Sequence, residues 1–437
     1  MVSIAVIFST LGNPKSLIPL AIKDTASTTG MIAGSYVTGK EEGHDRFIDE
    51  VGTEALWLGG IPFFKLIYDK TVFKALGLDA KFDARNFKDK NVLAKIKEYA
   101  PTEEVKENIN KITNKENIFK KAAASKFFFS TIMAVVTYIG LTKFKQKYTE
   151  KKIRENLIAE YNQQQDLQKE NEKKNTKPES LSFKGIGSAI ESFAFNPVKN
   201  MWLLDASITG ERLADSRSKQ EFIGYAIKEG SLLFFLYYAG GKIQELLEKN
   251  ATKKHNKSIS LDARVLEDNV LKDAFKDGSV EKCLEQFKAV GDNSVDIYEF
   301  LHKNPENLIV KSAKKSDIIS MYKEPQGLFK KAKITDKIDT RKYIDLEDIK
   351  GVANKIEKLY SQYKSALSNG ETADKFFETL TKLKRKSIIT NIGTCILALG
   401  VVTPGIMLLK RLSSKDDKEF ETKRQIREKL IEEGLIA

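Results

Sequence analysis

The feature that most constrains this 437-residue chain is a run of 22 residues without a charged side chain, at 388–409. As a helix this run is about 33 Å long, which matches a bilayer hydrocarbon core of about 30 Å. Basic residues flank it, at 382–386 on one side and at Lys410-Arg411 on the other. We therefore expect a membrane span here, and the alternative is a buried core helix of a soluble bundle.

Three residues inside this run bear on its structure. Pro404 would kink a soluble helix badly but is tolerated in a membrane span. Gly393 and Gly400 share one face of the expected helix, where they can admit a close helix contact, although the spacing is not GxxxG.

A second uncharged segment covers 127–142, and at 16 residues it reaches only about 24 Å as a helix. It spans a bilayer if it extends upstream through 122–125 and Lys126 snorkels to the interface. Because lysines flank both ends of both segments, the distribution of positive charge assigns no orientation.

Two weaker apolar segments lie at 55–64 and 230–241. Runs of 10–14 residues are more typical of buried, re-entrant or interfacial helices than of spans. The number of spans, two or four, therefore stays open.

Short echoes between the two halves of the sequence indicate a duplicated unit. Asp-Ala-Arg recurs at 83–85 and 262–264, and each copy is followed by Asp and then Asn-Val-Leu. Further echoes in the same order are Asn13-Pro14 with Asn196-Pro197, Thr29-Gly30 with Thr209-Gly210, 47–54 with 222–229, and 151–157 with 424–430. The offsets stay between 175 and 183 through the first echoes and then rise to 260 and 273. The alternative is two similar helical hairpins of similar composition.

This duplication defines the expected domains. Residues 11–162 form helical membrane unit A, 163–193 form a polar linker, and 194–437 form helical membrane unit B. The jump in offset places a soluble helical insert at about 272–380 in unit B. If the weak segments also cross the bilayer, the two units have parallel topology, as in transporters with parallel repeats. Basic helices favour the anionic cytoplasmic leaflet. The equivalent basic helices of units A and B lie on the same side of the membrane only with four spans or with none, so this preference favours those two arrangements.

The insert shows helical periodicity. Asp345, with Asp348 close behind, is a candidate N-cap, and Gly370 is a stop signal. Between them the apolar residues recur at three- and four-residue steps: Ile349, Val352, Ile356, Leu359, Tyr360 and Tyr363. A further helix over 373–386 should continue into the strong span. The segment 288–301 resembles half of an EF-hand loop, but Lys288 stands where the first carboxylate is needed, so we expect a polar turn.

Composition narrows the function classes. Lys, Glu, Leu, Ala and Ile dominate, strand-type alternation is scarce, and we expect an all-α fold. The net charge of +13 favours anionic partners. The densest basic run abuts the strong span, so we expect anionic lipid headgroups rather than nucleic acid. The sequence leaves open a protein partner through the insert, and it does not define an oligomeric state.

We identify no catalytic, cofactor-binding or metal-binding residues. His44, His255 and His302 are scattered in polar stretches that we expect to be exposed, and the two cysteines, Cys283 and Cys395, have no nucleophile context. Each Asp-Ala-Arg is expected to begin a helix with Asp as N-cap. Glu54 and Glu229 are equivalent in the repeat. We expect both in the headgroup region or on a solvated first helical turn, although buried carboxylates can mark ion paths.

The sequence thus predicts an integral membrane protein with soluble helical parts and no indicated catalytic activity. The first hypothesis is a structural or interaction protein that presents basic helical surfaces at a membrane. The second is a small-solute transporter or lipid-handling protein built on the parallel repeat. Transport requires a polar cavity between the units that is lined by Glu54 and Glu229.

Overall fold

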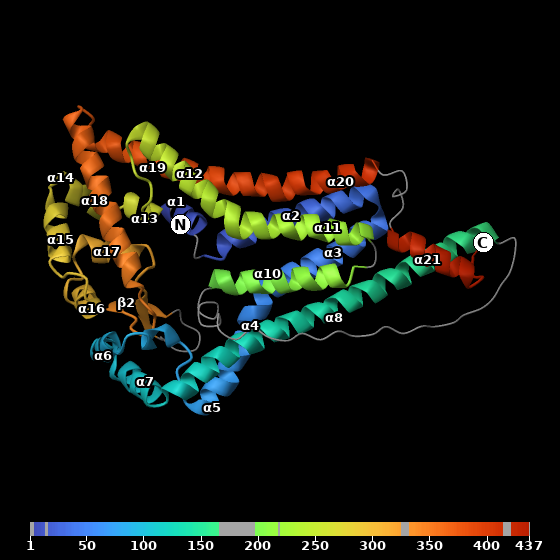
Figure 1. Cartoon of the computed structure of the whole chain (residues 1–437), viewed down its shortest axis with the longest axis horizontal. Helices are drawn as coiled ribbons and strands as arrows, with labels where there is room; N and C mark the ends of the chain where they lie inside the picture. The colour runs from blue at the N-terminus through green and yellow to red at the C-terminus, as the bar shows by residue number, and fades with distance from the viewer. Residues whose placement is uncertain are drawn as a thin grey trace. The chain divides into compact units, whose positions relative to one another are not determined.

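The computed structural model describes residues 4–13, 16–165, 197–216, 219–324, 332–413 and 421–436. The chain is predominantly helical, which confirms the expected fold class (Figure 1). Within the described ranges there is one departure, an antiparallel pair of short strands. The linker expected at 163–193 lies outside the described residues from 166 onward.

The fold divides into two compact units. Unit 1 contains 1–19, 67–126 and 241–392, and unit 2 contains 20–66, 127–240 and 393–437. Each compact unit takes segments from both halves of the sequence, so units 1 and 2 are a different division from the sequence units A and B. The duplication itself stays a prediction.

Unit 1 consists of short helices and the strand pair. Its elements are α1 (Ile4–Gly12), the π-turn η2 (Asp69–Phe73), α5 (Lys74–Leu76), the 3-10 helix η3 (Ala84–Phe87), α6 (Lys90–Glu98), α7 (Glu103–Asn114), α13 (Ala263–Leu266), α14 (Asn269–Lys276), α15 (Ser279–Lys288), α16 (Ser294–Lys303), α17 (Leu308–Lys315), β1 (Met321–Glu324), β2 (Lys333–Ile338) and α18 (Leu346–Ser368). In the strand pair, Met321 lies opposite Ile338 and Glu324 opposite Lys333, with a bulge between Met321 and Lys323.

The insert folds as its periodicity predicts. Asp345 is the N-cap of α18 and accepts from the backbone N–H of Glu347, and Gly370 follows the helix with a φ of 82°. All six residues of the expected apolar face are buried. That face packs in an aromatic cluster with edge-to-face contacts: Phe275, Tyr360, Tyr363, Phe376 and Phe377.

Both Asp-Ala-Arg segments begin helices, as expected. The Asp83 side chain caps η3 by accepting from the backbone N–H of Arg85, and Asp262 caps α13 through Arg264 in the same way. In each segment the guanidinium also binds the capping carboxylate. These residues therefore have a structural role.

Two other expectations for unit 1 can be compared with the structure. The EF-hand-like segment contains the turn before α16, where Asn293 caps the helix and Asp292 pairs with Lys350 at 2.9 Å. His302 was expected to be exposed, and this is wrong. Its ring stacks on Tyr99 at 4.3 Å because α16 packs against α6.

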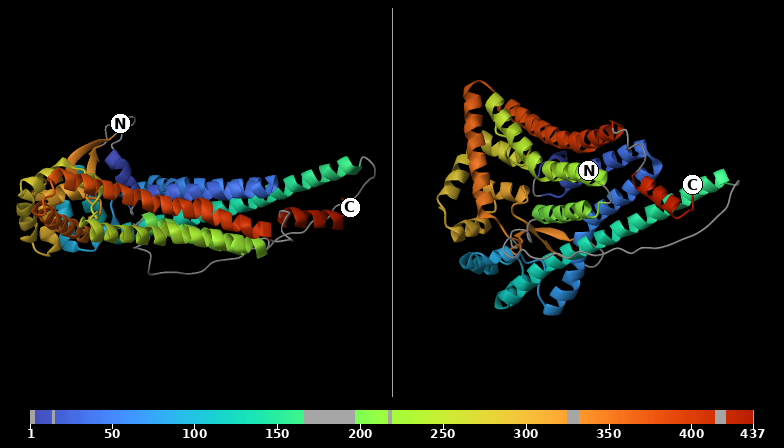
Figure 2. Two further views of the ribbon diagram at one scale, coloured as in Figure 1. Left: turned by 90° about the horizontal axis from the view of Figure 1, so that it is seen from above. Right: turned by 45° about the vertical axis from the view of Figure 1, so that its right-hand side comes forward.

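Unit 2 is a bundle of longer helices. Its elements are α2 (Ile18–Thr38), α3 (Lys40–Ala55), the π-turn η1 (Leu56–Gly60), α4 (Ile61–Tyr68), most of α8 (Glu116–Gln165), α10 (Pro197–Ala214), α11 (Lys219–Leu233), the π-turn η4 (Phe234–Ala239), the end of α19 (Ala373–Leu397), the π-turn η5 (Ala398–Val402), α20 (Thr403–Ser413) and α21 (Glu421–Glu432). After η4 the chain continues as α12 (Gly240–His255). Helices α2, α10, α11 and α20 run alongside one another (Figure 1, Figure 2).

The two strong apolar segments are helices with the length of a membrane span. Among the described residues, two helices are long and apolar enough to cross a bilayer, Glu116–Asn162 and Ala373–Lys410. The most apolar 18-residue stretch of each helix has a mean hydropathy of 1.5 and 2.2, respectively. Only 28% and 22% of those stretches are buried inside the structure. A core helix of a soluble bundle would have most of its apolar residues buried.

The two glycines of the strong apolar segment at 388–409 differ in how closely other residues approach them. A Cβ at Gly400 would lie 2.9 Å from the carbonyl oxygen of Ala26, so α2 passes close to η5 there. Nothing lies within 4 Å of a Cβ at Gly393. The expected close contact therefore forms at Gly400 alone. Gly400 lies within the π-turn η5, at whose end the backbone N–H of Thr403 donates to Ala398 O, and Pro404 follows directly.

The last turns of α8 pack against α21. Ile153 and Leu157 of α8 form a buried apolar cluster with Ile426, Leu430 and Ile436. The first four of these residues occupy matching positions in the echo between 151–157 and 424–430. The two basic helices that the echo pairs therefore bury their matching apolar sides against each other.

Candidate functional site

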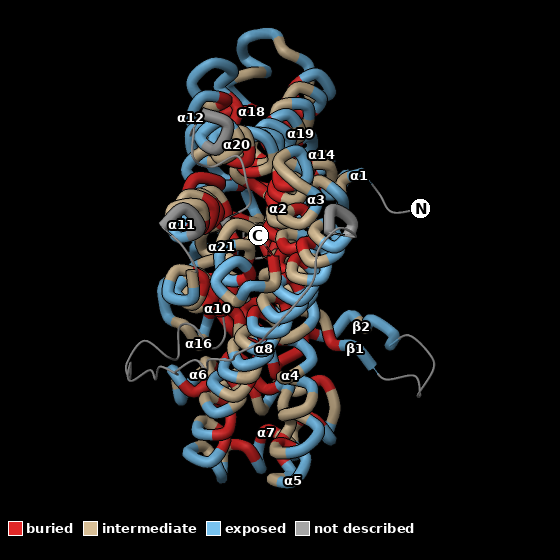
Figure 3. Tube along the Cα trace, turned by 90° about the vertical axis from the view of Figure 1, so that its right-hand side faces the viewer, coloured by how far each residue is buried: buried red, intermediate tan, exposed pale blue. Residues whose placement is uncertain are grey.

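Unit 2 has apolar residues on its outside and charged residues in its interior. Exposed side chains on its helices include Val37 at 70%, Val136 at 55%, Phe144 at 60% and Leu409 at 68%. The buried residues of α2, α10 and α11 lie on the sides of those helices that face one another (Figure 3). The buried residues of unit 2 include charged residues from α2, α3, α8, α10 and α11, which together form a charged core: Lys23, Asp45, Asp49, Glu50, Lys145, Asp205, Arg212, Lys228 and Glu229.

Helix α3 supplies the acids of this charged core. Asp45 and Asp49 are four residues apart, so they share one face of the helix, and Glu50 lies beside them. All three are less than 10% exposed. Thr53 extends the same row by one more turn.

Helix α8 places Lys145 opposite the first two acids. The Lys145 Nζ lies 3.8 Å from Asp45 and 3.7 Å from Asp49. Thr149, one turn further along α8, donates to Asp45 at 2.8 Å. The backbones can approach because Gly52 of α3 faces Leu141, where a Cβ would clash at 2.5 Å.

Helix α10 places Arg212 in the centre of the charged core. Its guanidinium binds Asp49 at 3.4 Å, donates to Thr53 Oγ1 at 2.9 Å and forms an ion pair with Glu229. Its Nε donates to the hydroxyl of Tyr138 at 2.7 Å. Every face of this buried cation therefore has a polar partner, as a buried charge requires.

Helix α11 contributes Lys228 and Glu229. The Lys228 Nζ lies 2.7 Å from Glu50 and 2.9 Å from Glu229, and its residue is 3% exposed. Arg46 gives Glu50 a second cation at 3.5 Å. Since α3 and α8 belong to sequence unit A and α10 and α11 to unit B, these ion pairs join the two halves of the proposed repeat.

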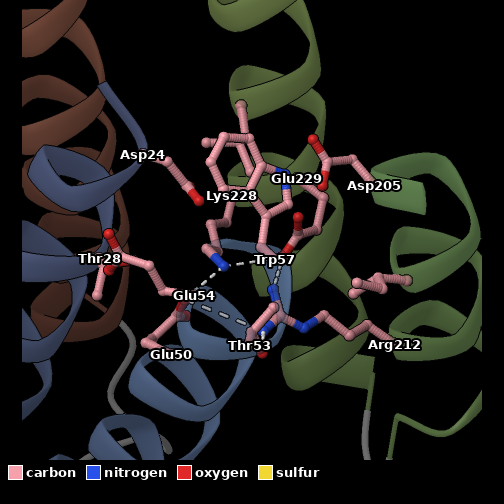
Figure 4. Close-up of a pocket in the computed structure, with 12 residues that line it drawn as sticks. Asp24, Thr28, Glu50, Thr53, Glu54, Trp57, Asp205, Arg212, Lys228 and Glu229 are labelled. Carbon is pink, nitrogen blue, oxygen red and sulfur yellow. Dashed lines mark hydrogen bonds and ion pairs between the residues drawn. The ribbon is translucent and has the colours of Figure 1, made fainter. Parts of the chain in front are cut away.

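A small cavity lies at one end of the charged core (Figure 4). The space open to water inside it is about 20 Å³, which is enough for one water molecule and too small for an organic solute. Its lining contains five carboxylates and two cations: Asp24, Glu50, Glu54, Asp205, Arg212, Lys228 and Glu229. Trp57 also lines it, and within the described residues its buried Nε1 has no hydrogen-bond partner.

Three of the lining carboxylates make no ion pair within the described part of the chain. Asp24 makes no hydrogen bond there either, Glu54 accepts from Thr25, and Asp205 accepts from Tyr237. The other two carboxylates are held by Lys228 and Arg212. The cavity thus has an excess of negative groups on the side formed by α2, the end of α3 and the middle of α10.

The expectation of a headgroup or first-turn position is wrong for Glu229, which is 2% exposed, and Glu54 is half-buried. The helices begin well before the weak apolar segments, at Lys40 and at Lys219, so both glutamates lie late in their helices. They line one cavity, which the transport hypothesis requires. The other charged residues of the core were not singled out by sequence reasoning. The sequence carries only a weak signal for them, the four-residue spacing of Asp45 and Asp49 on one face of α3.

The basic run 382–386 has partners inside unit 1. Lys382 donates to Glu378, Lys384 to the carbonyl oxygen of Ile259, and Arg385 binds Glu267 with two hydrogen bonds. Lys386 is exposed. Contact of this run with anionic lipid stays a proposal.

Comparisons with protein-family models, with curated proteins and with solved structures found no match for this chain.

Proposed function

We propose that unit 2 is embedded in a lipid bilayer and that the protein is a small-solute transporter built on a tandem repeat. The observation that carries this proposal is the reversed polarity of unit 2, with ion pairs and a polar cavity inside and apolar side chains outside. Charged side chains inside membrane bundles face the interior, pair with one another and mark solute or ion paths.

The exposed apolar surface supports the bilayer. In unit 2 the large apolar side chains that are at least 55% exposed come from seven different elements: Val37, Phe63, Ile132, Val136, Phe144, Tyr238, Leu397, Val401 and Leu409. Soluble monomers rarely expose contiguous apolar patches beyond a few hundred Å². In a bilayer, lipid tails cover such a surface, so its apolar side chains are not exposed to water.

The order of elements supports the tandem repeat. Each half runs through a helix that begins at or within a few residues of an Asn-Pro pair, a helix with a π-turn, an Asp-Ala-Arg cap, a second Asp-capped helix and a strong apolar helix. The chain leaves unit 2 after residues 66 and 240, which differ by 174, and the local echo has an offset of 175. It returns after residues 126 and 392, which differ by 266, between the later offsets of 260 and 273. Packing of the equivalent apolar residues of α8 and α21 gives further support.

The cavity supports transport over a purely structural role. Its lining comes from α2 and α3 of one half and from α10 and α11 of the other. In transporters with repeats, the substrate site lies at the interface between the repeats and near irregular helices. Here the π-turns η1 and η4 follow Glu54 and Glu229 within a few residues.

A second candidate is the structural or interaction protein that presents basic surfaces. The exposed lysines of α8 beyond its apolar window favour it. The side chains of Lys151 and Lys152 are 75% and 54% exposed, and both contact Glu155. These lysines would lie near anionic headgroups if unit 2 is in the bilayer.

Cysteine accessibility in native membranes tests the proposal. In a chain with Cys283 and Cys395 replaced by Ala, Thr28→Cys and Thr53→Cys introduce thiols at the cavity. We expect Ag⁺, a membrane-impermeant thiol reagent small enough for a site that holds one water molecule, to label at least one of them, because transport requires water access to the cavity. Val51→Cys, on the exposed apolar face of α3, is the matched control and should stay unlabelled.

Two outcomes contradict the proposal. If carbonate extraction releases the chain, unit 2 is not embedded. If the chain stays in the membrane and neither cavity thiol reacts, the charged core only holds helices together, and the structural candidate stands.

The ends of the bundle give a separate test of the bilayer. Thr149 of α8 lies beside Asp45 near the start of α3, and Arg212 near the end of α10 lies at the adjacent turn. The start of α10 and the end of α8 therefore lie toward opposite ends of the bundle. We expect Lys199→Cys and Glu160→Cys to be labelled from opposite sides of the membrane. Labelling from the same side would exclude a bilayer across this bundle.

A further inference from the structure

We propose that the species carried through the cavity is a proton, and that the unpaired carboxylates Asp24, Glu54 and Asp205 take it up. This inference rests on the proposed function and names its solute. Three observations carry it: the size of the cavity, the charge of its lining and the chain of polar groups that leads from it.

The size of the cavity selects the solute class. A space of about 20 Å³ holds one water molecule and excludes sugars, amino acids and lipid headgroups. A water there can accept from the unpartnered Nε1 of Trp57, which is 1% exposed, and donate to a carboxylate. Water and hydronium match this combination of a donor and several acceptors. Among the described residues no cluster of His, Cys, Asp and Glu side chains has the geometry to hold a metal ion.

The charge of the lining calls for a positive species. Five carboxylates face two cations, so three negative groups have no cationic partner. An ionised carboxylate in an apolar bundle is costly unless a cation or a proton accompanies it. Asp24 faces Glu50, Glu54, Lys228 and Glu229, and Asp205 lies within range of Asp24 and Tyr237. A single positive charge can therefore be shared among groups from α2, α3 and α10.

A chain of polar groups continues from the cavity along α3. Lys228 bridges Glu50 and Glu229, and Glu229 pairs with Arg212. From Arg212 the hydrogen bonds and ion pairs run through Tyr138, Asp49, Lys145 and Asp45 to Thr149. Trp57 lies in the π-turn η1, which directly continues α3, 12 residues after Asp45, so this chain covers about 18 Å of the bundle axis.

The step at each carboxylate is a simple transfer. An O–H bond of a hydronium ion or water breaks, an O–H bond forms on the carboxylate oxygen, and the electron pair stays with the departing water or hydroxide. Release to the next group reverses this. No oxidant, reductant or second substrate is needed.

Proton flux into proteoliposomes tests the inference. Purified full-length protein is reconstituted with a trapped pH-sensitive dye, and a potassium gradient with valinomycin balances the charge. We expect acidification faster than in protein-free liposomes, and its loss to the protein-free rate in Asp24→Asn, Glu54→Gln and Asp205→Asn. Glu245→Gln, an exposed carboxylate on α12 that pairs with Lys242 and Lys249, is the control and should keep the full rate.

The arms separate this inference from the proposed function. Suppose that the cysteine labels show unit 2 in the bilayer but the wild-type rate of acidification equals that of protein-free liposomes. Then the protein does not carry protons, and the proposed transport function stands only for another solute. If all three variants keep the wild-type rate of acidification, the three carboxylates do not take up the proton and the inference is wrong. Thermal unfolding of each variant in detergent shows whether a lost rate only follows a lost fold, which would also overturn the inference.

Discussion

Removal of one buried cation should destabilise unit 2 strongly. Lys228 is 3% exposed, and its Nζ lies 2.7 Å from Glu50 and 2.9 Å from Glu229. In Lys228→Met the methylene stem and its packing stay, and only the charge and its hydrogen bonds are removed. Both carboxylates then stay buried with fewer partners.

The expected magnitude follows from what each carboxylate retains. Loss of one partner from a buried ion pair costs about 3–5 kcal/mol, because the remaining charge is left without compensation. Glu50 keeps Arg46 at 3.5 Å, and Glu229 keeps Arg212. We therefore expect the lower end, a decrease of about 3 kcal/mol in the free energy of unfolding.

The assay is denaturant unfolding in bicelles, followed by the fluorescence of the two tryptophans, Trp57 and Trp202, of which Trp57 lines the same cavity. Glu50→Gln and the double variant Lys228→Met/Glu50→Gln complete a double-mutant cycle. The double variant should lose at least about 1 kcal/mol less than the sum of the single losses, because the two groups are in contact. Lys249→Met is the matched control, since its side chain is 71% exposed and its pair with Glu245 is a solvent-exposed surface pair that contributes little to stability. A loss under about 1 kcal/mol for Lys228→Met, or no coupling in the cycle, would refute the reasoning.

Three further predictions concern packing and pH. Gly30→Ala places a Cβ 2.1 Å from the carbonyl oxygen of Gly400 and should cost about 1–3 kcal/mol in the same unfolding assay, whereas Gly34→Ala, with its nearest contact at 3.9 Å, should cost less. Phe376→Ala empties the centre of the aromatic cluster in unit 1 and should cost about 3–5 kcal/mol; a loss below about 1 kcal/mol would contradict the packing. Burial lowers the pKa of His302 from 6.5 to about 4, so between these pH values the unfolded chain binds a proton that the folded chain does not. Wild-type stability should fall by up to about 3 kcal/mol more than that of His302→Phe as the pH drops from 6.5 to 4, and parallel profiles would exclude this effect.

Local signals in the sequence predicted much of unit 1. The N-cap at Asp345, the apolar face of α18 and the caps at Asp83 and Asp262 all depend on residues within a few positions of one another. Such short-range rules are encoded in the chain itself. The strand pair was missed because its short strands carry mostly polar residues and show no alternation.

The charged core could not be predicted by the same rules. Hydropathy selects helices that are apolar all round, and it found the segments at 127–142 and 388–409. Helices α2, α3, α10 and α11 carry charges such as Asp49 and Arg212, which lower their hydropathy. Those charges are buried only because helices from both halves of the chain bring the partners together, and pairing over such a distance in sequence leaves no local pattern.

The distinction between paired and unpaired groups separates the two candidate functions. Arg212, Lys228, Glu50 and Glu229 are each held by opposite charges, so helix assembly alone can account for them. Asp24 forms no ion pair within the described residues, and an ionised carboxylate without a close cation destabilises an apolar bundle. A purely structural core would gain stability from Asp24→Asn. Substitutions of the paired residues should therefore lower the stability of the protein. Asp24→Asn should instead leave the stability unchanged or raise it, and still abolish proton flux. A purely structural role does not produce this combination.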